Sequence, residues 1–140
     1  MTSINFKKNE TMTISSEVKK GEVYRYWIFE HEAIGTEIKK EERVGAIISN
    51  NRLNRWDKRF LIVPLTTKKL DKQYNYEVRT FVDNQHGKAL IDQIKTIDKS
   101  RLLKKTGQLT TKEMNAISEK LLAIFDLWEY LEEKENFPNH

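Results

Sequence analysis

The 140-residue sequence predicts a mainly β protein, a small and strongly twisted antiparallel β-barrel covered by one C-terminal α-helix. Two observations predict this class. Short segments rich in β-branched and aromatic residues, separated by charged or turn-forming residues, occupy positions 22–109. Residues 110–131 then carry apolar side chains at three- and four-residue spacing, which is typical of a helix with one buried face. A chain of this length suits a single domain with a single core.

The expected strands share a high content of Val, Ile, Tyr, Phe, Trp and Thr. They span residues 22–29, 44–49, 61–65, 74–82, 88–97 and 107–109. The charged residues 30–42 are expected to form a long loop, and residues 83–87 a turn. Because Pro64 cannot donate a ladder hydrogen bond, its strand is expected at a sheet edge, or Pro64 itself at a bulge. The segment 88–97 is interpreted as one strand or as a strand pair around Gln93.

Two helix starts are marked by capping residues. Asp98 is a suitable N-cap for a short helical turn that runs through Leu103. Thr110, followed by Glu113 at the third position, forms a capping box. The stripe that follows predicts one helix of about six turns. Its members are Met114, Ile117, Leu121, Ile124, Phe125, Trp128 and Leu131. The stripe is expected to face the core, with partner contact as the alternative for its outer end.

The domain organisation is simple. Residues 1–20 form a polar N-terminal extension that is a candidate for disorder, residues 21–135 the folded domain, and residues 136–140 a tail. No apolar run approaches the ~20 residues that a bilayer requires, and the N-terminus lacks the apolar core of a secretory signal. The absence of cysteine removes disulfide and thiolate-metal chemistry. We therefore expect a cytoplasmic protein without membrane attachment.

Charge is divided unevenly along the chain. Residues 1–112 contain 23 Lys or Arg against 14 Asp or Glu, whereas residues 113–140 contain 2 against 7. A basic body favours a polyanionic partner, because contacts from Lys and Arg to phosphates release condensed counterions. A solvated charged face is the alternative interpretation. The three histidines are dispersed, so no metal site is predicted, and no other cofactor is expected.

A basic stretch with interleaved aromatic residues flanks Thr66 in the sequence. Its cationic members are Arg52, Arg55, Lys58, Arg59, Lys68, Lys69 and Lys72, and the aromatic residues among them are Trp56 and Phe60. Aromatic rings stack unpaired bases while Lys and Arg follow the backbone, so this composition favours binding of single-stranded nucleic acid. The alternative is a charged hairpin loop with Trp56 folded onto the core.

Three short segments carry a further pattern. Residues 35–38 read Gly-Thr-Glu-Ile and precede Arg43-Val44, Thr66 closes an apolar strand, and residues 93–98 read Gln-Ile-Lys-Thr-Ile-Asp. Over residues 21–127 the chain thereby resembles the MazF/PemK family, the ribosome-independent endoribonuclease toxins of bacterial type II toxin-antitoxin modules. In that family the segments are Gly-Ser-Glu-Gln, Arg-Pro, a strand-ending threonine and Gln-Ile-Arg-Thr-Ile-Asp. This chain departs from them at Val44 and Lys95, where the family has proline and arginine.

The resemblance implies a barrel of the SH3-like, CcdB/MazF type and a metal-independent endoribonuclease of the mRNA interferase kind. RNA would be cleaved by its own 2′-hydroxyl, which requires only alignment and stabilisation of charge on the phosphate. Arg43 is the implied transition-state stabiliser, and Thr66 would hydrogen-bond the phosphate or the attacking hydroxyl. The expected RNA contacts are Glu37, Arg52, Arg55, Trp56, Lys58, Arg59, Lys68, Lys69 and Gln93. The resemblance assigns no general base. Glu37 is a candidate by its position in the loop, with an ordinary solvated charge as the alternative, and His31 and His86 are of a residue type that titrates in the useful range but lie outside the matching segments.

The resemblance also implies the partners. They are single-stranded RNA, a second copy of the chain in a homodimer, and a cognate antitoxin whose acidic, disordered tail occupies the RNA groove. Operator DNA would be bound through the antitoxin complex. Two alternative functions remain. One is a catalytically inactive relative that binds RNA or protein, and the other is a gyrase inhibitor of the CcdB type, against which Arg43, Thr66 and the C-terminal residues 137–140 argue.

Overall fold

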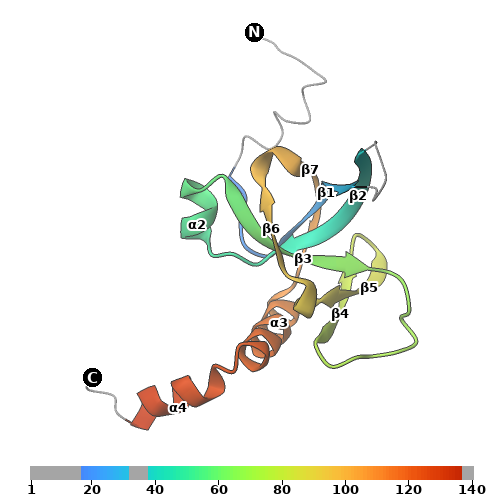
Figure 1. Cartoon of the computed structure of the whole chain (residues 1–140). Helices are drawn as coiled ribbons and strands as arrows, with labels where there is room; N and C mark the ends of the chain where they lie inside the picture. Colours follow the sequence, from blue (N-terminus) through green and yellow to red (C-terminus); the bar gives the residue numbers. More distant parts are fainter. Residues whose placement is uncertain (1–16, 32–37, 137–140) are drawn as a thin grey trace.

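The computed structural model describes residues 17–31 and 38–136. Within them, seven strands form one strongly curved antiparallel sheet, and one long helix packs against it (Figure 1). The elements are β1 (Glu22–His31), β2 (Ile38–Ile47), α2 (Asn51–Trp56), β3 (Arg59–Thr66), β4 (Glu77–Val82), β5 (Gln85–Leu90), η1 (Ile91–Gln93), β6 (Lys95–Asp98), η2 (Lys99–Arg101), β7 (Leu102–Gln108), α3 (Thr111–Ile124) and α4 (Trp128–Asn136). The mainly β, barrel-like fold predicted from the sequence is confirmed as a half-barrel with C-terminal helices.

The strand order places β3 inside the sheet. It is β4-β5-β3-β2-β1-β7, and β6 pairs with the first half of β3. The expectation that Pro64 marks an edge strand is therefore wrong. Pro64 lies in the gap between the β6 ladder, which ends at Ile62, and the β5 ladder, which begins at Leu65. Its missing N–H consequently costs no ladder hydrogen bond on that side.

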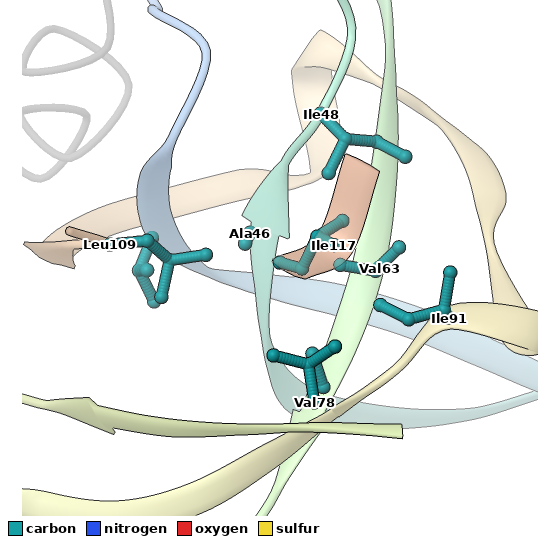
Figure 2. Packing of buried hydrophobic residues seen from close by; sticks show 9 residues of the cluster. Ala46, Ile48, Val63, Val78, Ile91, Leu109 and Ile117 are labelled. Atoms are coloured by element: carbon teal, nitrogen blue, oxygen red, sulfur yellow. The ribbon is translucent and has the colours of Figure 1, made fainter. Parts of the chain in front are cut away.

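Side-chain alternation along the strands produces two apolar clusters, one on each face of the sheet. One cluster contains Tyr26 and Phe60. The other contains Ala46 and Val63, and Figure 2 shows how Ile117 of α3 packs over them. Full burial of a large apolar side chain contributes about 1.5–3 kcal/mol to the free energy of folding. The central strands β1, β2 and β3 are thus fixed from both sides.

The β1–β2 hairpin is longer than the sequence predicts. Pairing continues to the end of both strands, so residues 38–42, expected in a loop, belong to β2. Ladder hydrogen bonds and cross-strand side chains, such as the Arg25–Glu42 ion pair at 2.8 Å, override the poor strand propensity of this Lys- and Glu-rich segment. Arg43 consequently lies within a strand and not at its start. Residues 32–37 lie outside the described residues.

The fourth predicted strand is shorter than expected. Val78 and Thr80 are buried, as the alternation predicts. Tyr74 and Tyr76, expected on the same face, precede β4 and are exposed. Residues 83–84 have positive φ angles, which is typical of a two-residue type I′ hairpin turn. The predicted turn is therefore present, but β5 begins directly after these two residues.

The sequence analysis does not predict α2, which lies in the middle of the basic stretch. Asn50 caps its start by accepting the Leu53 N–H at 2.8 Å. The buried Asn54 side chain then donates to the Ser49 carbonyl at 2.9 Å. A helix of six residues carries no apolar stripe, so the asparagine at the N-cap is the one signal that could have indicated it.

The C-terminal helix starts as predicted and ends early. Both hydrogen bonds of the Thr110–Glu113 capping box are present. The single six-turn helix is wrong, because Asp126 adopts the left-handed region with φ 57° and separates α3 from α4. The apolar residues beyond α3 are exposed, and they are Phe125, Leu127, Trp128, Tyr130 and Leu131. Among the described residues, no helix is long and apolar enough to cross a bilayer.

The described end of the N-terminal segment contacts the folded domain. Val18 is 2% exposed and belongs to the same cluster as Tyr26. Glu17 pairs with Arg55 of α2 at 3.0 Å. The sequence analysis assigned both residues to the extension, because isolated apolar residues in a polar segment define no element. Residues 1–16 lie outside the described part of the chain.

Glu22, at the start of β1, is a buried carboxylate whose replacement tests a pH-dependent part of the stability. Its oxygens accept hydrogen bonds from the Lys19 amide, the Tyr24 hydroxyl and Lys105 at 2.9, 2.9 and 3.0 Å. Burial opposes ionisation, but these bonds outweigh burial, so the pKa of Glu22 lies below its ordinary value. Glu22→Gln is expected to lower the free energy of unfolding by about 1–3 kcal/mol at neutral pH.

The sign of this pH dependence follows from the lowered pKa in the folded state. The Glu22 contribution is fully present above the ordinary pKa of 4.5 and is lost as the pH falls through the lower folded-state pKa. Urea denaturation of the wild type and Glu22→Gln across the acidic range measures the effect. The difference between the two proteins should shrink with acidification, and a constant difference would contradict the assignment.

Candidate active site

Arg43 on β2 and Thr66 at the end of β3 lie on neighbouring strands. The β2–β3 register ends with Val44 opposite Leu65, so one further step places Arg43 opposite Thr66. Residues opposite each other in an antiparallel pair share one face of the sheet, with Cβ atoms about 4.5–5.5 Å apart. The fold thus brings together two residues that the resemblance named as catalytic.

The Arg43 guanidinium is held weakly at the surface. Its Nη2 pairs with Glu41 Oε1 at 2.9 Å, and the two side chains are 44% and 46% exposed. Such an exposed ion pair contributes about 0–1 kcal/mol, so a phosphate can displace the carboxylate. The β1 residue opposite Arg43 is Tyr26. Burial raises the pKa of the Tyr26 phenol, and the positive charge of Arg43 opposes this rise. The site therefore offers a permanent cation that can exchange partners.

The Thr66 hydroxyl is oriented by the loop that follows β3. Its Oγ1 accepts the Lys68 backbone N–H at 3.1 Å. A hydroxyl also carries one donor, and among the described residues no acceptor takes it. Thr66 is paired with Lys88 of β5 as well, so its position depends on the packing of β3 against β5.

Both residues line a cleft of about 330 Å³, where β1, β2 and β3 meet the β4–β5 hairpin. The polar residues of its wall are Arg25, Glu42, Arg43, Thr66, Thr67, Lys68, Thr80, Asp83, Gln85, His86 and Thr106. The wall thus contains three cations, two carboxylates and one histidine. One of the carboxylates, Glu42, is paired with Arg25 at 2.8 Å. A concave site with this polarity suits a ligand that carries phosphate.

Among the wall residues that the sequence did not predict is Arg25, and no position was predicted for His86. Arg25 alternates with the buried Tyr24 and Tyr26, so its side chain starts from the face of β1 opposite to the one that Tyr26 shares with Arg43, and both arginines line the cleft. The sequence does not show what else that face contacts. His86 was considered as a general base without a location, and the hairpin places it at the rim of the cleft. The side chain of His31 and all of Glu37 lie outside the described part of the chain.

Most of the basic stretch lies away from this cleft. The predicted RNA contacts outside its wall are Arg52, Arg55, Trp56, Lys58, Arg59, Lys69 and Gln93. Figure 1 shows α2 near the first residues of β3, and Arg59 is about 24 Å from Thr66 at ~3.4 Å per residue. Trp56 is 78% exposed, so the alternative in which it folds onto the core is wrong. For Arg52, Arg55, Trp56, Lys58 and Arg59, nearness to Thr66 in sequence did not predict nearness in space, because the length of β3 separates them from Thr66. Lys69 follows Thr66 closely and is outside the wall as well.

Two cations hold the loop between β3 and β4, which carries Lys68 into the cleft. Lys88 is buried, and its Nζ donates to the carbonyls of Lys69 at 2.8 Å and Lys72 at 3.3 Å. The same atom pairs with Glu77 at 2.9 Å. Arg79, opposite Lys88 in the β4–β5 register, donates to two loop carbonyls. The loop conformation therefore depends on these side chains.

Gly87 permits β5 to approach β3 beside Thr66. A Cβ at this position would lie 2.8 Å from the Thr66 carbonyl oxygen. Because that oxygen belongs to the backbone, the strands would have to separate. Gly87→Ala is expected to lower the free energy of unfolding by about 1–3 kcal/mol and to move the Thr66 amide signal in an NMR spectrum. An unchanged urea-unfolding curve would contradict this close approach.

The class of protein follows from a family comparison made with this fold and cleft in view. The chain matches, over residues 19–125, the family described as PemK-like, MazF-like toxin of type II toxin-antitoxin system. The chain belongs to this family, as the resemblance predicted. A comparison with curated proteins found no match.

Solved structures agree with this assignment. An endoribonuclease in complex with its cognate antitoxin, from a mycobacterial species, is 26% identical, with a TM-score of 0.62 over 79% of this chain and 96% of that one. A second mycobacterial endoribonuclease is 25% identical, with a TM-score of 0.63 over 79% and 93%. A MazE-MazF structure from Deinococcus radiodurans is 18% identical, with a TM-score of 0.61 over 79% and 97%, and shows the fold alone.

Proposed function

We propose that this chain is the endoribonuclease of a type II toxin-antitoxin pair and that it cleaves single-stranded RNA without a metal ion. The observation that carries the proposal is that Arg43 and Thr66, each next to the Val44–Leu65 pair, line one cleft with further cations. Membership of the toxin family and the fold shared with solved endoribonucleases support the same activity.

In the proposed reaction, the 2′-oxygen of a ribose attacks the adjacent phosphorus, and the bond from phosphorus to the 5′-oxygen breaks. The products are a 2′,3′-cyclic phosphate and a 5′-hydroxyl. Arg43 exchanges Glu41 for the non-bridging oxygens, on which negative charge increases in the transition state. Thr66 donates to the phosphate or to the attacking hydroxyl and so limits the geometries that the RNA can adopt.

The other cations have separate roles in this proposal. Arg25 and Lys68 line the same cleft and contact the phosphates that flank the scissile one. The basic residues of α2 do not line the cleft and lie near the end of β3 opposite to Thr66. They would bind RNA further along the strand, where backbone contacts raise affinity without reading sequence.

The proposed partners are a second copy of the chain and a cognate antitoxin. A solved relative is an endoribonuclease bound to its antitoxin. An acidic antitoxin tail would compete with RNA for Arg25, Arg43 and Lys68, and the complex would bind operator DNA through the antitoxin. Sedimentation of the purified chain tests the homodimer, and a monomer at all concentrations would contradict it.

The activity is tested by incubating a long single-stranded RNA with the purified protein in EDTA and mapping every fragment end. Cuts restricted to a few sites are expected, with the same sites in Mg²⁺. The Arg43→Ala protein, purified in the same way, controls for contaminating nucleases. Intact RNA after incubation with folded, antitoxin-free protein would contradict the proposal and leave a relative that binds without cleaving.

A further inference from the structure

Phe81 and His86 form an exposed aromatic pair on the β4–β5 hairpin. They are opposite each other in the register, and their ring centroids are 4.6 Å apart at an interplanar angle of 48°. Phe81 is 50% exposed, and a large apolar ring at the surface is informative because a smaller residue there would expose less apolar area. The neighbouring pair, Thr80 and Gly87, is buried, so the aromatic rings lie on the other face of the hairpin.

A second hollow adjoins the cleft on the side of the aromatic pair. This hollow, of about 540 Å³, lies between β4 and α3, and both Phe81 and His86 line it. His86 also lines the cleft that contains Arg43 and Thr66. The two concave regions share Thr80 and His86 in their walls, and a strand of RNA that leaves the cleft past His86 would enter the hollow.

The charge of the hollow suits a polyanion. Lys112 and Lys120 of α3 line it, and neither has an ion-pair partner among the described residues. Its two carboxylates are engaged within the protein. Glu77 pairs with Lys88 at 2.9 Å, and Glu113 accepts the Phe81 and Thr110 amides at 2.7 and 2.8 Å. Arg79 lines the hollow as well, so three cations stand against these two carboxylates and the net charge of the wall is positive.

We propose that the Phe81–His86 pair is a stacking platform for one unpaired base of the RNA, beside the scissile nucleotide, with Lys112 and Lys120 contacting the adjacent phosphates. This inference rests on the proposed function, which supplies the RNA. An exposed ring beside free cations is the combination by which proteins hold single strands, since every base has a face that can stack. The Phe81 ring also contacts the ring of His86, with 4.6 Å between the two centroids.

The test measures binding of a short RNA whose attacking ribose is 2′-deoxy, so that it stays intact. Single abasic positions are moved along this RNA, one per molecule. The proteins are the wild type, Phe81→Ala and Phe81→Tyr, and Phe29→Ala is the matched control because Phe29 is an exposed aromatic residue on β1, against Arg101. Phe81→Ala should weaken binding of the full RNA about 5- to 100-fold. Phe81→Tyr and Phe29→Ala should stay within about threefold.

The abasic series separates stacking from a structural effect. At one position, removing the base should weaken binding by the wild type. With this abasic RNA, Phe81→Ala should cause no further loss of affinity, because both changes remove the same contact. The platform is overturned if Phe81→Ala causes no loss of affinity for the full RNA. It is also overturned if Phe81→Ala causes the same loss of affinity with every abasic RNA. Absence of any RNA binding by the wild type overturns both the platform and the proposed function. Coupled binding without cleavage of the all-ribose RNA keeps the platform and overturns catalysis alone.

Discussion

Replacing Arg43 with alanine is expected to slow RNA cleavage by a factor of about 10² to 10³. The guanidinium is the group that opposes the charge gained by the non-bridging oxygens, and its partner Glu41 is exposed and easily displaced. The loss should fall on kcat more than on KM, because the interaction strengthens in the transition state. Single-turnover cleavage of a defined RNA by the wild type and Arg43→Ala measures it.

Two further variants make the Arg43 result specific. Arg43→Lys keeps the charge but removes the planar fork of donors, so an intermediate rate is expected. Lys134→Ala removes one exposed cation from α4, outside the residues that match the family, and should leave the rate within about twofold. Equal rates for Arg43→Ala and Lys134→Ala would contradict the assigned role. Circular dichroism and urea unfolding verify that each variant is folded.

Replacing Lys88 with alanine is expected to lower the free energy of unfolding by about 3–5 kcal/mol. The change leaves Glu77 as a largely buried carboxylate without its cation, since the Lys88 side chain is 3% exposed and the Glu77 side chain 12%. It also leaves the carbonyls of Lys69 and Lys72 without their donor. Urea denaturation at neutral pH measures the change through the midpoint at constant slope.

A double variant tests whether the uncompensated charge is the cause. Lys88→Met combined with Glu77→Gln removes both charges and keeps the volume and the oxygen that accepts the Tyr74 amide. It should recover most of the stability lost in Lys88→Ala, because buried ion pairs can be replaced by neutral groups at little cost. A double variant as unstable as the single one would show that the loop contacts dominate instead.

Local signals in the sequence predicted the parts of this fold that depend on neighbouring residues. The capping box at Thr110 and Glu113 and the N-cap at Asp98 are both present. Alternation placed Val78 and Thr80 on the buried face of β4. In each case the physical cause lies within a few positions of the chain, which is why a single sequence is sufficient.

Features set by distant pairing were predicted incorrectly or missed. Residues 38–42 resemble a loop in composition and become a strand because β1 supplies the ladder. Pro64 indicated an edge strand of the sheet. The sequence does not show that β6 pairs with the first part of β3 and β5 with its last part, which leaves Pro64 between the two ladders. The break at Asp126 has no glycine or proline to mark it. Propensity was overridden here by tertiary context.

The candidate site shows the same division. Arg43 and Thr66 were named through a family resemblance, and their position opposite each other came from the β2–β3 register. Arg25 belongs to no motif and enters the cleft because β1 lies beside β2. The basic residues of α2 were grouped with Thr66 by sequence distance, although β3 separates them. Their roles in RNA binding stay predictions.

The central claim, cleavage by the 2′-hydroxyl of the substrate, is tested most directly with one RNA in two forms. The first contains ribose at the mapped cleavage position, and the second differs by a single 2′-deoxy substitution there. In EDTA, the account predicts that the first form yields a 2′,3′-cyclic phosphate and a 5′-hydroxyl, identified by mass spectrometry, and that the second stays intact while binding equally well. Cleavage of the deoxy form at the same bond would contradict the account, because the attacking nucleophile would then come from water or from the protein.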